Sequence, residues 1–66
     1  FNIMSDFKTR LETEKVELEE RLSRLDDFLM SDKVKDIDDV QKALLGVQST
    51  AMNTYLRCLE ERLERL

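Results

Sequence analysis

The sequence predicts an all-α fold, an antiparallel hairpin of two helices that assembles into a helical oligomer. Its 66 residues include no proline and a single glycine, so nothing interrupts a long helix. Leucines recur at heptad spacing in two regions, and the short polar stretch between them makes the two helices antiparallel neighbours. A chain this small buries little surface. One cysteine and no histidine provide neither a disulfide nor a Cys/His metal site, so we expect oligomerisation instead.

The first four residues are expected to lie outside the hairpin, which spans residues 5–66. Met4 is a candidate natural start, with Phe1 to Ile3 left over from expression, and residues 1–4 are interpreted as such a remnant or as a disordered start. Alternatively, Phe1 to Ile3 are all native. Ser5 or Asp6 is predicted to cap the first helix, residues 5–30, by accepting hydrogen bonds from free amides of its first turn.

The predicted first helix carries an apolar seam on one face and ion pairs on another. The seam consists of Phe7, Leu11, Leu18, Leu22, Leu25 and Leu29, at steps of 4, 7, 4, 3 and 4. The acid-before-base pairs at i,i+4 are Asp6–Arg10, Glu17–Arg21 and Glu20–Arg24. Each such pair contributes about 0.2–0.5 kcal/mol and marks the solvated face. Lys8 and Lys15 interrupt the leucine line, so either their stems cover apolar surface or they line a cationic pocket.

The connection, residues 31–38, is predicted to hold one turn with Val34 and Ile37 pointing inward. Asp38 followed by Gln41 is a capping-box pattern, which starts the second helix, residues 39–66, at Asp39. The aspartates here also suggest a Ca²⁺ loop, but the glycine and terminal Glu of an EF-hand are missing.

The second helix has more apolar surface than one partner helix can cover. Residues 43–56 contain no charge in a chain that is 39% charged, which predicts burial on more than one side. Two apolar lines run along it: Leu45, Met52, Tyr55, Leu59 and Leu66, with Gln48 and Arg62 also on this line, and Leu44, Val47, Ala51, Cys58 and Leu63. Small residues around Gly46 are expected to let another helix approach closely.

Catalysis has little chemical basis in this sequence, and we expect neither an enzyme nor a cofactor. There is no histidine for acid–base work, and adjacent aspartates point about 100° apart on a helix. Cys58 lies on an apolar line, where packing is expected rather than reactivity. The net charge of -4 argues against DNA as a partner, and no apolar run is long enough to span a membrane. A single thiol and no signal peptide favour a cytoplasmic location.

Ligand binding is chemically possible. Phe7 and Tyr55 offer flat rings on which a base can stack, and Arg10, Arg21 and Arg62 can fork to phosphate. Alternatively, Phe7 belongs to the core and the arginines to the solvated face. Symmetry in an oligomer would repeat each arginine around an axis and so build a stronger anion pocket.

The sequence resembles the small helical-hairpin family of phage counter-defence proteins that act as sponges for cyclic nucleotide signals of CBASS and Thoeris immunity. The matching positions are Phe7-Lys8-Thr9-Arg10-Leu11, Glu14-Lys15, Glu17-Leu18, Leu25, Phe28-Leu29, Leu44-Leu45, Gln48, Ala51-Met52, Tyr55, Leu59 and Glu61-Arg62-Leu63. They cover nearly the whole chain from Phe7. Leucine spacing is shared by any hairpin, whereas Gln48-x-x-Ala51-Met52-x-x-Tyr55 followed by Glu61-Arg62 is more particular.

The resemblance implies an oligomer, often a hexamer built as a trimer of dimers, in the cytoplasm of an infected bacterial host. It implies binding of cyclic di- or trinucleotides between subunits, without cleavage. It places Phe7 at a stacking position where the family usually has Tyr, and Arg21 at a phosphate contact on the first helix. Arg62 matches the late arginine of a three-fold pocket. The alternative is a structural or adaptor hairpin that binds only protein.

Overall fold

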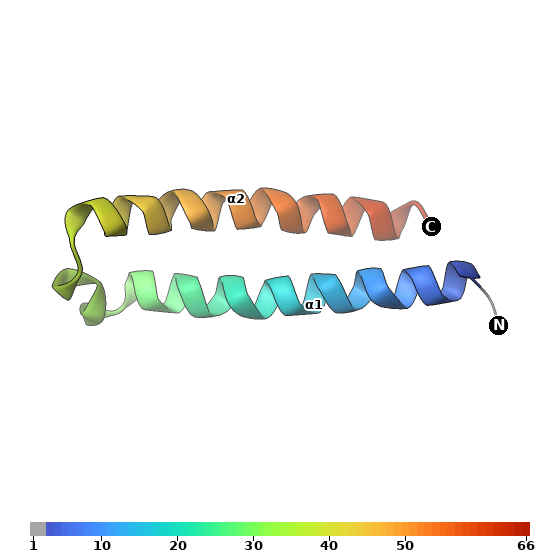
Figure 1. The fold of residues 1–66 in the computed structure, drawn as a ribbon, viewed down its shortest axis with the longest axis horizontal. Helices are drawn as coiled ribbons and strands as arrows, with labels where there is room; N and C mark the ends of the chain where they lie inside the picture. Colours follow the sequence, from blue (N-terminus) through green and yellow to red (C-terminus); the bar gives the residue numbers. More distant parts are fainter. Residues whose placement is uncertain (1–2) are drawn as a thin grey trace.

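The computed structural model describes residues 3–66, with side chains from residue 5 onward, and is a hairpin of two long helices (Figure 1). Helix α1 spans Ile3–Met30, the 3-10 helix η1 spans Asp32–Asp36, and helix α2 spans Asp39–Glu64. The molecule measures 51 × 15 × 13 Å, and the start of α1 and the end of α2 lie at the end opposite the connection (Figure 1). The predicted all-α antiparallel hairpin is therefore confirmed. Residues 1–4 were expected to lie outside the hairpin; of these, Phe1 and Asn2 are not among the described residues.

Helix α1 begins at Ile3, earlier than the sequence predicted, so the expected cap at Ser5 or Asp6 is wrong. Both residues lie inside the helix. The carbonyl oxygen of Ser5 accepts a bond from Thr9 Oγ1 at 2.9 Å, and Asp6 Oδ2 accepts one from Arg10 Nη2 at 2.7 Å. Asp6 still lies in the first turn, where a negative charge is favourable next to the positive end of the helix dipole.

The connection and the start of α2 follow the prediction. Val34, within η1, is buried, and Ile37, which follows η1, is half-buried, so both point inward. Asp38 Oδ2 accepts hydrogen bonds from the amides of Val40 at 3.0 Å and Gln41 at 3.3 Å, which confirms Asp38 as the N-cap. Helix α2 ends at Glu64 rather than at residue 66, because its last amides bond in a tighter turn, from Leu66 to the Leu63 carbonyl at 3.2 Å.

One apolar layer lies between the two helices. Its centre is formed by Leu11, Leu18 and the fully covered Leu59, and the half-buried Met52, Leu56 and Leu63 pack against it. Leu63 therefore belongs to this layer and not to the second line to which the sequence assigned it. An inter-helix hydrogen bond from Ser49 Oγ to Asp26 Oδ1, 2.7 Å long, joins the helices nearer the connection.

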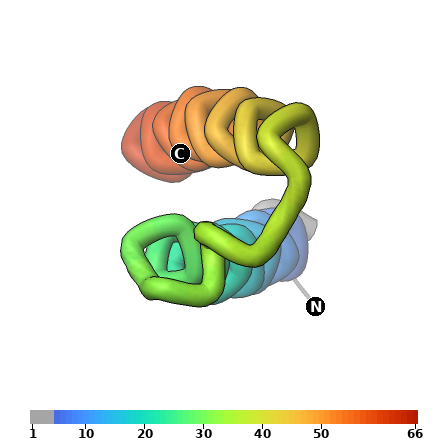
Figure 2. Tube along the Cα trace, turned by 90° about the vertical axis from the view of Figure 1, so that its left-hand side faces the viewer, coloured from blue at the N-terminus to red at the C-terminus, as the bar shows by residue number. Residues whose placement is uncertain are grey.

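The charge-free part of α2 is not buried on a second side in this single hairpin, contrary to the prediction. Among the described residues, α1 is the one long helix that lies beside α2, as the view along the hairpin shows (Figure 2). The outer face of α2, which we define as Val40, Leu44, Val47, Ala51 and Cys58, is exposed, with Val47 66% accessible. A Cβ added at Gly46 would meet no heavy atom within 4 Å, so α1 does not explain that glycine.

Candidate functional site

Phe7 and Arg62 come together at the open end of the hairpin, where the start of α1 faces the end of α2. The guanidinium carbon of Arg62 lies 5.9 Å from the centroid of the Phe7 ring, which is within the range of a cation–π contact. Phe7 is 42% exposed, so the expectation that it belongs to the buried seam is wrong. The pair offers a flat apolar surface and a cation at one accessible place.

Arg10, another of the candidate arginines, lies outside the Phe7–Arg62 pair. Its guanidinium bonds the carboxylate of Asp6 at 2.7 Å, and its side chain is 78% exposed. This is one of the three predicted i,i+4 ion pairs, and it forms as expected. The neighbouring Lys8 approaches Glu12 at 3.9 Å with its side chain 58% exposed.

A second cluster surrounds Arg21 in a groove midway along the hairpin, between α1 and α2. The groove has a volume of about 430 Å³, and its lining consists of Leu18, Arg21, Arg24, Gln48, Met52 and Tyr55. Leu18 is buried and Met52 half-buried, which makes the base of the groove apolar. Tyr55 is 43% exposed, so its ring is accessible from the solvent.

The two predicted ion pairs Glu17–Arg21 and Glu20–Arg24 are not formed. Among the residues that the structure describes, ion pairs within 4 Å involve Lys8, Arg10, Lys35 and Arg65. Exposed pairs contribute little, so other side-chain positions compete with them. Arg21 and Arg24 instead border the inter-helix groove, where their stems can cover apolar surface while their guanidinium groups remain accessible.

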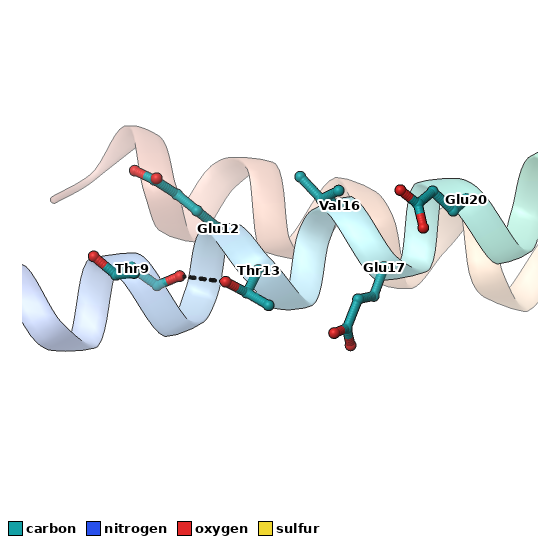
Figure 3. Close-up of a pocket in the computed structure, with 6 residues that line it drawn as sticks. All are labelled: Thr9, Glu12, Thr13, Val16, Glu17 and Glu20. Carbon is teal, nitrogen blue, oxygen red and sulfur yellow. Dashed lines mark hydrogen bonds between the residues drawn. The ribbon is translucent and has the colours of Figure 1, made fainter.

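Two further hollows belong to one helix each. The first lies on α1 around Val16, and Figure 3 shows the carboxylates of Glu12, Glu17 and Glu20 around it, with Thr13 Oγ1 donating to the Thr9 carbonyl at 3.0 Å. Three acids make this surface unsuited to an anion. The second, about 510 Å³, lies on α2 and is lined by Thr54, Arg57, Cys58, Glu61, Arg62 and Arg65. It shares Arg62 with the Phe7–Arg62 pair.

Comparison with known protein families matches residues 5–65 to the family described as Sequestin. The chain belongs to the Sequestin family. No curated protein and no solved structure matches it. The family match spans both helices and the connection, so it includes the open-end pair and the groove around Arg21.

The sequence did not predict that Arg24 and Gln48 line the groove around Arg21 in this Sequestin protein. The available signal was the spacing of Gln48, Tyr55 and Arg62, which recur every seven residues and so form one line along α2. Only the pairing of the helices shows which α1 residues face that line. No group of three or more His, Cys, Asp or Glu residues suited to a metal ion occurs in the described part of the chain. None of its helices is both long and apolar enough to cross a membrane.

Proposed function

We propose that this protein binds and sequesters cyclic oligonucleotide immune signals without cleaving them, as a phage counter-defence protein in the cytoplasm of an infected bacterial host. The name of the Sequestin family supports sequestration as the general activity. The resemblance of the sequence to cyclic-nucleotide sponges supports the nature of the ligand. The observation that carries the proposal is the accessible Phe7–Arg62 pair.

The chemistry of that pair suits a nucleotide. The exposed ring of Phe7 can stack on a base, since stacking requires only a flat face and tolerates any base. The guanidinium of Arg62 can donate two parallel hydrogen bonds to a phosphate. Arg57 and Arg65, which line the adjacent hollow, add positive charge. Arg65 Nε forms an ion pair with Glu61 Oε2 at 3.5 Å. Arg57 and Arg62 are therefore the arginines of this hollow that form no ion pair within the described part of the chain.

We propose that the hairpin functions as a homo-oligomer, with a hexamer favoured. A compact monomer of 7.8 kDa is expected to expose about 4,400 Å². The hairpin exposes 5361 Å², and the outer face of α2 contributes apolar surface to that excess. A second copy covering this face would bury it and would repeat the Phe7–Arg62 pair by symmetry. A ligand with two or three phosphates would then meet two or three arginines.

A structural hairpin that binds only protein is the second candidate, because the same exposed outer face of α2 would serve a protein partner equally well. The two functions differ in what they require of Phe7 and Arg62. Sequestration needs the ring and the cation to be accessible to a small ligand, whereas a scaffold needs neither.

Native mass spectrometry of the protein mixed with cyclic di- and trinucleotides tests the proposal. We expect an oligomer-sized ion that carries intact ligand, and its stoichiometry indicates whether a two-fold or three-fold axis binds. Ligand recovered with altered mass would contradict binding without cleavage. An oligomer that retains no cyclic nucleotide at micromolar concentration would favour the scaffold.

A further inference from the structure

We infer that the groove bordered by Arg21 and Arg24 of α1 and by Gln48 and Tyr55 of α2 is a second nucleotide subsite, complete within one hairpin. It would accept a phosphate group and the planar base attached to it. The inference rests on the proposed function, because it extends nucleotide binding from the open end to the middle of the molecule. It concerns a different surface, so the two can be tested separately.

The positive charge of the groove is available to a ligand. Arg21 and Arg24 are three residues apart on α1, which places them on neighbouring turns of the same face. Each has a glutamate four residues earlier, yet neither forms an ion pair within 4 Å, and no other hydrogen bond is recorded for either side chain. Two free guanidinium groups at one place, in a chain of net charge -4, match a phosphodiester.

The opposite wall of the groove suits a base. Tyr55 presents a ring that is 43% exposed above the apolar base formed by Leu18 and Met52. A base that stacks on this ring would also cover the apolar atoms below it. Gln48 carries both a donor and an acceptor, which can read the edge of a base. Its amide is engaged only by a long contact from Nε2 to Met52 Sδ, 3.9 Å, and is easily released.

The groove is distinct from the Phe7–Arg62 pair, although both lie on one flank. Tyr55 precedes Arg62 by seven residues on α2, so the two residues are separated by about 10 Å along the helix. Glu14 lies on α1 between Phe7 and Arg21, seven residues from each, and its negative charge separates the two basic regions. Each hairpin thus has two places where an aromatic ring and arginine occur together, and the groove needs no second subunit.

Titration of the ¹⁵N-labelled protein with 5′-AMP, followed by NMR, tests this inference. We expect saturable shifts at Arg21, Arg24, Gln48 and Tyr55. The double variant R21Q/R24Q should abolish them while shifts at the open end persist. The matched control K33Q/K42Q removes two exposed cations outside the groove, the same change in net charge, and should retain all shifts. Y55L should weaken 5′-AMP binding about 5- to 150-fold and leave the response of Arg21 and Arg24 to inorganic phosphate unchanged.

The outcomes separate this inference from the proposed function. Shifts confined to Phe7 and Arg62, or equal losses in R21Q/R24Q and K33Q/K42Q, would overturn the groove and leave sequestration intact. Groove shifts with 5′-AMP, in a protein that binds no cyclic di- or trinucleotide, would support the groove and overturn sequestration of cyclic signals. A protein that binds neither 5′-AMP nor a cyclic nucleotide contradicts both. Thermal melting of each variant verifies that the helices remain folded.

Discussion

Leu59 is the residue on which the hairpin's packing depends most. It is fully covered and forms one core cluster with Leu11 and Leu18 of the opposite helix. We predict that Leu59→Ala lowers the free energy of unfolding by about 2–5 kcal/mol, through lost apolar burial and the cavity left behind. Urea denaturation measures the change. Met30→Ala is the control, because Met30 is 88% exposed and loses no packing. Equal destabilisation by both substitutions would contradict this account of the core.

Arg62 is the residue that most directly tests ligand binding at the open end. We predict that Arg62→Glu abolishes cyclic trinucleotide binding and leaves the oligomer mass unchanged, because it replaces the cation beside Phe7 with an anion that repels phosphate. Isothermal titration calorimetry and native mass spectrometry measure the two quantities. Lys42→Glu is the matched control: it changes the net charge equally on the same helix, at an exposed position next to the connection and far from Phe7. Unchanged binding would remove Arg62 from the site.

At the scale of the element, Asp38 fixes where α2 begins. Its carboxylate accepts from two amides that the helix itself leaves unpaired. We predict that Asp38→Ala lowers the free energy of unfolding by about 1 kcal/mol, whereas Asp38→Asn retains the cap and most of the stability. Thermal unfolding followed by circular dichroism provides the measurement. Asp36→Ala is the control, since Asp36 makes no recorded capping bond; a loss as large as that of Asp38→Ala would show that charge, not capping, matters.

The two helices could be predicted from the sequence because heptad spacing and the Asp38 cap are local signals. The predicted cap of the first helix was wrong, because Ser and Asp also occur inside helices. Only the course of the backbone shows that α1 already begins at Ile3, before Ser5 and Asp6. Periodicity located the apolar faces of α2 but not what covers them, so the exposure of Val47 was missed. The groove required the register between the helices, and no single-helix pattern shows that Arg24 borders the same hollow as Tyr55.

At the scale of the whole molecule, the hairpin has one apolar layer and an apolar outer face without a partner. The layer is narrow, because two helices share only one line of contact (Figure 2). Chains of this size bury little surface and are only marginally stable when they fold alone. Association of copies would stabilise the folded state by an amount that increases with the logarithm of their concentration. If copies associate through the exposed outer face of α2, stability and assembly would be coupled there.

Gly46 distinguishes a free hairpin from an assembled one. Within one chain a Cβ added at Gly46 would meet no side chain and no part of α1 within 4 Å, so Gly46→Ala should raise the free energy of unfolding by about 1 kcal/mol through better helix propensity. If a second copy packs closely against this part of α2, the larger Gly46→Leu should instead lower the oligomer mass. Thermal unfolding and analytical ultracentrifugation measure both effects. An unaltered oligomer in Gly46→Leu would place the subunit contact elsewhere, whereas a destabilised Gly46→Ala would show that the glycine is already in contact with a neighbouring chain.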